Sequence, residues 1–334
     1  MRAIQLKRFG GPDVLDVVEM PKPLPEAGEV LIRVRAAGVN FFEVLMRGDR
    51  YAVTPDLPVI LGVEVSGTVE ALGQGVDASL TGTRVAAPLF ASKRPFGGYA
   101  EYVTIDAKLA VPLPDILSFE DATALMVQGL TAFHLLRQSP PAGKSVLVTA
   151  AAGGVGSLLV QLAKRQGAST VIAVAGSRAK LDLALSLGAD AAVDYSMSDW
   201  PMRVREAAGG AGVDVVYDIV GGTMTAASLQ ALAPGGELVF AALGRCAIGA
   251  AELEAMITRN KSLRGFALLP LLSADGLRAS LSELFHLAAG GQLAVTQGGR
   301  YPLDQANEAH RLLEERRSTG KVVLIPLSSG SAFP

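Results

Sequence analysis

A short apolar run followed at once by a glycine-rich loop is the feature that most constrains this 334-residue chain. The apolar run is Ser145–Thr149, and the loop after it, residues 151–156, reads AAGGVG. Apolar residues then recur at helical spacing between Val155 and Ala163, and a second apolar run covers Thr170–Val174. This order predicts a β–α–β unit, in which a tight loop joins a buried strand to a helix that leads to a second, parallel strand.

The glycines of this loop suit a bound pyrophosphate. Without side chains, backbone N–H groups and the positive end of the following helix can approach an anionic group. Ala151 replaces the first glycine of the GxGxxG pattern, so the prediction depends on the loop's position between strand and helix. The alternative is a tight turn that binds no ligand. The expected dinucleotide contacts are Ala152, Gly153, Gly154 and Val155.

The residues after the second strand indicate which dinucleotide is bound. An NAD site normally places a carboxylate there, about 20 residues after the glycines, to hold the ribose hydroxyls. This chain has Ala175 at that point, and residues 176–180 read GSRAK. Two cations and a hydroxyl without a carboxylate suit a 2′-phosphate, which predicts NADPH. The expected contacts are Gly176, Ser177, Arg178 and Lys180; the alternative is that both cations are exposed residues that open a helix.

Composition and charge exclude several other classes of protein. The formal net charge is −2 and charged residues make up 19% of the chain, so no surface for nucleic acid or anionic membranes is indicated. Cys246 is the only cysteine, which excludes an intrachain disulfide and a zinc site of several thiolates. The sequence has neither a signal peptide nor a membrane span, so we expect a cytoplasmic protein.

The chain divides into three zones of different pattern. Residues 1–117 are rich in proline, glycine and short β-branched runs, which predicts many short strands. Residues 118–266 alternate apolar runs with helical stretches, as is typical of a parallel sheet covered by helices. The last zone holds helical patterns at 281–289 and 306–316 and a final strand at 321–325.

Short segments along the whole chain carry a family resemblance. They are Ala37–Phe41, Leu57–Glu64, Gly97–Val103, Gln128–Ala132, Ala150–Gly156 and Gly320–Val323. With them the chain resembles the zinc-independent, zeta-crystallin-like quinone oxidoreductase branch of the medium-chain dehydrogenase/reductases. The resemblance implies an α/β fold: a Rossmann doubly wound parallel sheet, residues 121–266, inserted in a GroES-like, mostly β substrate domain of residues 1–120 and 267–334. It also implies an active site in the cleft between the two domains.

The resemblance bears on metal chemistry as well. Zinc-dependent relatives carry Cys, His and Cys at the positions of Asn40, Val63 and Gln128, and none of these three residues is a usual zinc ligand. We expect no metal, and we expect structural roles for the dispersed histidines His134, His286 and His310. Without a Lewis acid, alcohol dehydrogenation is disfavoured. Reduction of an activated acceptor remains, and the resemblance implies a quinone or a conjugated carbonyl such as an enone.

Two residues on the acceptor side are carried over from the family. Asn40 corresponds to a cleft position near the nicotinamide, where its amide can donate to an acceptor carbonyl; its alternative role is a turn or cap. Tyr51 matches a tyrosine proposed to assist protonation, although the Gly48-Asp49-Arg50 before it departs from the family pattern. A packing role is the alternative for Tyr51.

Further residues are carried over on the cofactor side. Lys180 and Tyr195 match the residues that flank the 2′-phosphate in NADPH-preferring relatives. Tyr195 follows the short apolar run Ala191–Val193, which places it at the carboxyl edge of the sheet, where it can also be a covering aromatic. The expected contacts with the nicotinamide end are Thr131, Phe240, Leu243, Gly244 and Phe266, of which the two phenylalanines can equally be core.

Two other functions stay open at this point. One is enoyl-thioester reduction, for which Arg47, Arg50, Lys93 and Arg94 would form a basic channel; the alternative is solvated loop charge. The other is a non-catalytic NADPH-binding protein. Relatives are commonly homodimers or homotetramers joined through Rossmann edge strands. The late apolar runs 238–242 and 263–267 predict such an edge, which usually needs covering.

Overall fold

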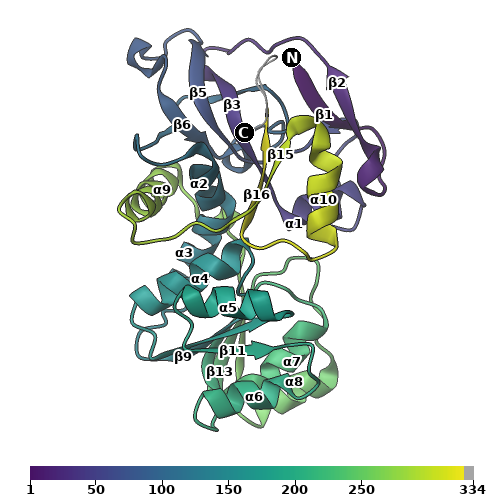
Figure 1. Ribbon diagram of the computed structural model, residues 1–334, viewed down its shortest axis with the longest axis vertical. Coiled ribbons are helices and arrows are strands. Elements are labelled where there is room, and N and C mark those ends of the chain that lie inside the picture. The colour runs from purple at the N-terminus through teal and green to yellow at the C-terminus, as the bar shows by residue number, and fades with distance from the viewer. Residues whose placement is uncertain (327–334) are drawn as a thin grey trace. The chain divides into compact units, whose positions relative to one another are not determined.

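The computed structural model of the protein describes residues 1–326 (Figure 1). Six parallel strands from the middle of the sequence form one sheet. In space they are ordered β11-β10-β9-β12-β13-β14. This is the strand order of a Rossmann fold, so the predicted doubly wound sheet is confirmed. The strands are β9 (Ser145–Val148), β10 (Thr170–Ala175), β11 (Ala191–Asp194), β12 (Val213–Asp218), β13 (Leu232–Phe240) and β14 (Ser262–Gly265).

Helices cover this sheet because parallel strands need long crossover connections. α4 packs on β9 and β10, α5 on β10 and β11, and α7 on β12 and β13. α3 lies beside α4. The helices are α3 (Leu130–Gln138), α4 (Gly154–Arg165), α5 (Arg178–Ser186), α6 (Trp200–Ala207), α7 (Thr223–Ala231) and α8 (Ala250–Ile257), and a short 3₁₀ turn covers Leu269–Leu271. Together, Gln128–Leu271 form one unit of the chain.

The rest of the chain forms a second unit, made from Met1–Val127 and the segment that begins at Leu272. Its larger sheet has the order β15-β16-β3-β5-β6-β8, with β7 also paired to β3, and its smaller sheet has the order β2-β1-β4. Val322 of β16 pairs with Val39 of β3, so both ends of the chain share one sheet. This is the GroES-like domain expected from the resemblance. The strands are β1 (Arg2–Leu6), β2 (Leu15–Glu19), β3 (Glu29–Val39), β4 (Val59–Ile60), β5 (Val65–Leu72), β6 (Arg84–Ala87), β7 (Tyr102–Asp106), β8 (Val111–Pro112), β15 (Gln297–Pro302) and β16 (Lys321–Ile325).

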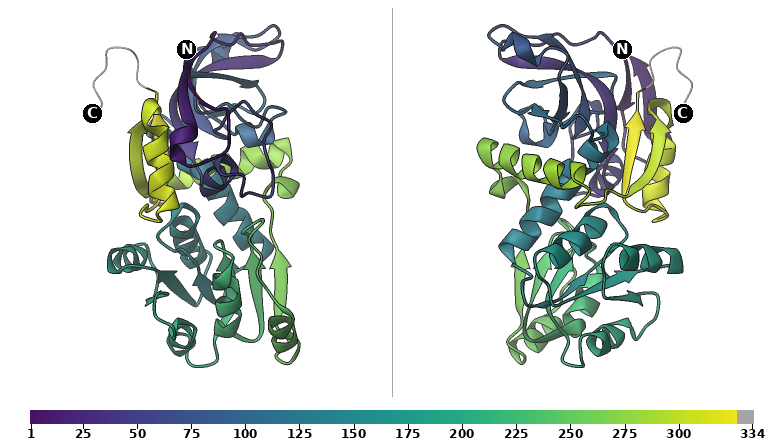
Figure 2. Two further views of the ribbon diagram at one scale, coloured as in Figure 1. Left: turned by 90° about the vertical axis from the view of Figure 1, so that its right-hand side faces the viewer. Right: turned by 60° about the vertical axis from the view of Figure 1, so that its left-hand side comes forward.

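Few helices belong to this second unit. α10 lies beside β15 and β16, as the yellow segments of Figure 2 show, and it also packs against α1. The longer helices are α1 (Phe41–Arg47), α2 (Phe119–Ala124), α9 (Ala274–Ala289) and α10 (Ala306–Glu314). Short 3₁₀ turns cover Pro12–Val14, Ala78–Leu80, Leu89–Ala91 and Leu303–Gln305. Among the residues that the structure describes, no helix has the length and apolar character that crossing a membrane requires.

Candidate functional site

The glycine loop turns sharply between β9 and α4. Ala150 has a left-handed backbone with φ of 46°, and its carbonyl accepts a hydrogen bond from Gly153 N–H at 2.8 Å. A Cβ added to Gly156 would lie 2.2 Å from that same carbonyl oxygen, so only glycine lets the helix begin this close to the strand. The N–H groups of the first turn of α4 have no partner within the helix. The loop therefore has the backbone features that a pyrophosphate needs.

Nearly all of the predicted cofactor contacts lie at one edge of the six-stranded sheet. Parallel strands end on the same side, and in a doubly wound sheet ligands bind along that edge. Thr131 is the exception, because it is the second residue of α3. The others follow strand ends: Ala152–Val155 after β9, Gly176–Lys180 after β10, Tyr195 after β11, Phe240, Leu243 and Gly244 at or after the end of β13, and Phe266 after β14. The arrangement places the predicted residues other than Thr131 along one edge of the sheet.

The residues expected at the 2′-phosphate differ in their surroundings. Tyr195 N–H donates to Ala175 O at 3.2 Å, and a Cβ added to Gly176 would lie 2.6 Å from the Tyr195 hydroxyl oxygen. Lys180 is half-buried, and burial lowers its pKa. The Arg178 side chain is 86% exposed and pairs with Asp182 at 2.9 Å. Lys180 and Tyr195 are thus less exposed than Arg178.

Two carboxylates at this edge were not singled out by sequence reasoning. Asp218, at the end of β12, is fully buried, and its Oδ1 accepts from Gly221 N–H at 3.0 Å while its Oδ2 accepts from Thr225 Oγ1 at 2.5 Å. It therefore shapes the loop after β12. Asp194, at the end of β11, is in register with Ala175. In the sequence, each of these two carboxylates is recognisable only as a single acidic residue at the end of an apolar strand.

The GroES-like unit contains a buried polar cluster around Glu64, which we call the Glu64 cluster: Asn40, Glu43, Glu64, Tyr99 and Lys321. Each of these residues is at most 3% exposed. Lys321 Nζ donates to Glu64 Oε1 at 2.5 Å and to Asn40 Oδ1 at 2.9 Å. Asn40 Nδ2 donates to Glu64 Oε1 at 2.8 Å. The orientation of the Asn40 amide is therefore fixed by a cation on one side and a carboxylate on the other.

Glu43 extends this cluster from α1, whose N-cap residue is Asn40. Its Oε2 accepts from Asn40 N–H at 2.7 Å, and its Oε1 accepts from Gly62 N–H at 3.0 Å. Tyr99 OH donates to Oε2 at 3.3 Å. Burial raises the pKa of Glu43 to about 7, although the Asn40 N–H and the Lys321 ammonium both lower it. Asn40 is thus the N-cap residue of α1, while its side chain contacts Glu43, Glu64 and Lys321.

The cations of the suspected basic channel are largely paired. Arg47 is fully buried and donates to Glu314 Oε2 at 2.6 Å, and Arg50 donates to Glu314 Oε1 at 2.6 Å. Arg94 pairs with Glu29. These three arginines are paired with carboxylates, whereas Lys93, the fourth cation of the suspected channel, is exposed.

Tyr51 lies beyond the C-terminal end of α1 and folds back over that helix. Its ring centroid is 5.6 Å from that of Phe42, the second residue of α1. The side chain is half-buried, and this burial raises the pKa of the phenol, which remains protonated at neutral pH. The ring packing supports the alternative role of Tyr51, and the protonated hydroxyl is compatible with proton donation.

No metal centre is visible in the part of the chain from residue 1 to residue 326: it has no group of three or more His, Cys, Asp or Glu placed to hold an ion. His310 is fully buried on α10, where its Nε2 lies 3.0 Å from Tyr99 OH. Burial lowers the pKa of His310 to about 3, with a further contribution from Arg47, so the imidazole is neutral. His310 is thus buried and paired with Tyr99 within the GroES-like unit.

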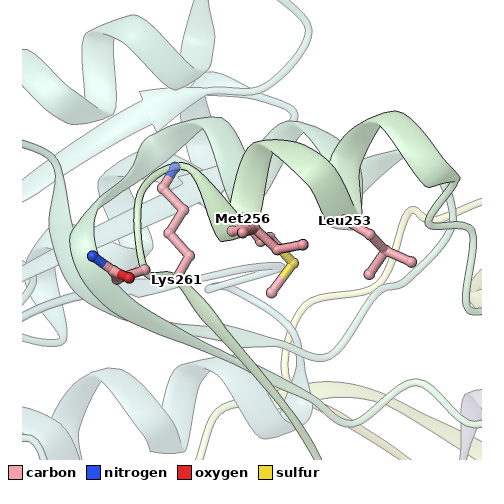
Figure 3. A pocket seen from close by; sticks show the side chains of 5 residues that line it. Leu253, Met256 and Lys261 are labelled. Carbon is pink, nitrogen blue, oxygen red and sulfur yellow. The ribbon is translucent and has the colours of Figure 1, made fainter.

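A pocket of about 450 Å³ lies elsewhere in the Rossmann unit, at the C-terminal end of α8. Figure 3 shows Leu253 and Met256 on the helix and Lys261 on the segment that follows it. The lining residues are Leu253, Met256, Ile257, Asn260 and Lys261. None of the predicted cofactor residues lines this pocket.

Comparisons with known proteins agree with this architecture. Residues 26–115 match the family model "Alcohol dehydrogenase GroES-like domain", and residues 154–284 match "Zinc-binding dehydrogenase". The chain is 35% identical over 335 residues to the quinone oxidoreductase of Salmonella typhimurium, covering 97% of this chain and 99% of that protein.

Solved structures show the same similarity. Escherichia coli quinone oxidoreductase complexed with NADPH has a TM-score of 0.89 and 33% identity, covering 98% of this chain and 100% of that chain. A mycobacterial protein complexed with NADPH has a TM-score of 0.88 and 38% identity, with the same coverage.

The buried carboxyl of Glu43 predicts a pH-dependent stability. The pKa of this carboxyl rises from 4.5 to about 7 on folding, because burial favours the protonated form. The protonated carboxyl therefore contributes its full stabilisation of the fold below about pH 4.5, and this contribution is lost as the pH rises through 7. The loss is roughly 3 kcal/mol. Urea denaturation gives the free energy of unfolding of the wild-type protein and of Glu43→Gln at each pH. We expect the wild-type value minus the variant value to fall by about this amount between about pH 5 and about pH 8.

Glu308→Gln is the matched control for this measurement, because Glu308 is an exposed carboxylate on α10. Its difference from wild type should change little with pH. An equal pH dependence in Glu43→Gln and the wild-type protein would show that Glu43 is not the titrating group.

Proposed function

The chain belongs to the quinone oxidoreductase branch of the medium-chain dehydrogenase/reductases, and on that premise we propose that it reduces quinones and related conjugated carbonyls with NADPH, without zinc. NADPH is the cofactor of this enzyme. The observation that carries the proposal is the convergence of the glycine loop, Lys180 and Tyr195 at the carboxyl edge of the Rossmann sheet. Quinones and enones are both reduced by one hydride and one proton.

The residues of the Rossmann unit bind and orient the cofactor, which supplies the hydride when bound. The N–H groups of Gly154 and Val155, in the first turn of α4, would hold the pyrophosphate, and Gly156 keeps the helix close to the strand. Lys180 and Tyr195 hold the 2′-phosphate, because an ammonium and a phenol are both donors to a phosphate oxygen. Thr131, Phe240, Leu243, Gly244 and Phe266 contact the nicotinamide end in this proposal.

Residues of the GroES-like unit act on the acceptor. Asn40 Nδ2 lies 2.8 Å from Glu64 and 3.3 Å from Glu43, so one of its two hydrogens is only weakly bonded and can be donated to an acceptor carbonyl. The protonated Tyr51 hydroxyl is the second donor. With the hydride that the cofactor would supply and the proton from Tyr51, a quinone would become a hydroquinone.

The residue types at the zinc-ligand positions support a reaction without zinc. Asn40 and Gln128 carry amides and Val63 carries an alkyl side chain, whereas zinc prefers thiolates, imidazoles and carboxylates. The one carboxylate beside them in sequence, Glu64, already binds the Lys321 ammonium at 2.5 Å. Activity that persists after extensive dialysis against a chelator would agree with this part of the proposal, and its loss would contradict it.

A direct assay tests the proposed reaction. The pure protein is mixed with NADPH and 9,10-phenanthrenequinone, and NADPH oxidation is followed by absorbance. We expect turnover with the quinone and with simple enones, and little with enoyl thioesters, because Arg47, Arg50 and Arg94 are paired with carboxylates. Preferential turnover of enoyl thioesters would instead support the alternative function, an enoyl-thioester reductase. Tight NADPH binding without any turnover would support a non-catalytic role.

The 2′-phosphate site predicts a cofactor-specific defect in Lys180→Ala. Loss of one charge-assisted contact should raise the KM for NADPH about tenfold, while the KM for NADH, which lacks the phosphate, should change little. Arg203→Ala serves as the matched control, because it removes an exposed cation of α6 that pairs with Asp199, the residue before the helix. A preference of the wild-type enzyme for NADH, or an equal defect with both cofactors, would contradict this assignment.

We also propose that the enzyme is a homodimer, or a homotetramer built from such dimers. β14 is the last strand of the six-stranded sheet, and all four of its residues are exposed. Leu263 on this strand is 38% exposed, and Ile257, which helps to line the α8 pocket, is 77% exposed. An unpaired edge strand with apolar side chains usually needs covering, and a second copy of β14 can pair with it.

Leu263→Lys is expected to weaken this association, because a lysine on an edge strand opposes pairing with another strand. Ultracentrifugation should show a dimer for the wild-type protein and an increased monomer fraction for the variant. Ile116→Lys changes a residue that is 80% exposed in the GroES-like unit, and it should leave the dimer intact. A wild-type protein that sediments as a monomer would refute the proposed association.

A further inference from the structure

Gln128 lies beside the glycine loop in an unusual turn of the chain. A π-helical turn, Leu125–Gly129, joins α2 to α3. Such turns are rare in proteins and are frequent at functional sites. Within the turn, Val127 N–H donates to Glu64 Oε2 at 2.6 Å, and Glu64 is fully buried. Val127, in the first part of the turn, is therefore held by a member of the Glu64 cluster.

The Gln128 amide covers the first residue of α4. A Cβ added to Gly154 would lie 2.0 Å from Oε1 and 2.3 Å from Nε2 of Gln128, so the amide rests directly on this glycine. Oε1 is buried, and within residues 1–326 no group donates a hydrogen bond to it. A buried carbonyl oxygen without a donor is costly. A bound ligand at the loop can supply the missing hydrogen bond.

The location of this oxygen indicates which part of NADPH supplies the donor. A pyrophosphate at the first turn of α4 carries only acceptors and cannot satisfy it. The adenosine half of the cofactor extends toward the end of β10. α3, which follows the turn, is joined instead to the other half of the sheet. Tyr217 OH on β12 donates to Ser139 O at 2.5 Å, and Gln138 Nε2 donates to Gly265 O on β14 at 3.3 Å.

We propose that Gln128 Oε1 accepts a hydrogen bond from the nicotinamide half of NADPH, either from its carboxamide N–H or from a ribose hydroxyl. The inference rests on the proposed function, because it takes NADPH to be bound at the glycine loop. Both donors are uncharged, which suits a neutral amide oxygen. Gln128 thereby orients the half of the cofactor that carries the hydride, a role that the glycine pattern itself does not include.

Gln128→Met tests the contact, because methionine keeps a side chain of similar length over Gly154 and lacks the amide. The loss of one neutral hydrogen bond should raise the Kd for NADPH about fivefold, measured by titration calorimetry. The Kd for 2′,5′-ADP, which lacks the nicotinamide half, should not change. Gln138→Met is the matched control: its Oε1 is also buried without a partner among the described residues, but it lies at the C-terminal end of α3.

Two more ligands separate the possible donors. The 3-acetylpyridine analogue of NADPH lacks the carboxamide N–H, so a carboxamide contact predicts equal Kd values for the wild-type protein and Gln128→Met. 2′-Phospho-ADP-ribose retains the ribose, so a ribose contact predicts that the defect persists with this ligand. An unchanged Kd for NADPH, or an equal defect with 2′,5′-ADP, would overturn the proposal. Failure of the wild-type protein to bind NADPH would overturn the proposed function, and this inference with it.

Discussion

The ion pair between Lys321 and Glu64 is the interaction on which much of the GroES-like unit depends. Both side chains are fully buried, and removing one partner of such a pair leaves an uncompensated charge at a cost of about 3–5 kcal/mol. Through it, the last strand β16 is joined to the segment before β5 and to Asn40 at the start of α1. Glu64 also accepts from Val127 N–H, so the same carboxylate holds the π-helical turn before α3. Asn40 and Val127 are thus both held by one buried carboxylate.

Local sequence patterns were sufficient to predict the elements that carry the cofactor. The expected final strand at 321–325 matches β16, and the expected strand at 145–149 ends one residue earlier, at Val148. Buried parallel strands are continuous apolar runs, which short windows of sequence reveal. β13 begins at Leu232, well before the apolar run at 238–242 that predicted it. Its first half contains Pro234 and two glycines, which are residues that normally argue against a strand.

The charged partners at the candidate site could not be predicted in the same way. Sequence alone makes Arg47 a candidate for a basic channel, but it pairs with Glu314, 267 residues further along the chain. Asn40 was identified by its family position, yet its contact with Lys321 spans 281 residues. No periodicity or motif links positions so far apart, because only the sheet formed by both ends of the chain brings them together. The raised pKa of Glu43 depends on burial, which this same packing creates.

The pairing of β16 with β3 also bears on the order in which the chain folds during synthesis. Residues 128–271 form their own unit, and all of them leave the ribosome before Lys321 is added. Domains generally fold as units, with earlier ones first. The nascent Rossmann unit can therefore form its sheet while Glu64 still awaits its cation. The GroES-like unit, although it starts first, is the one that must be completed last.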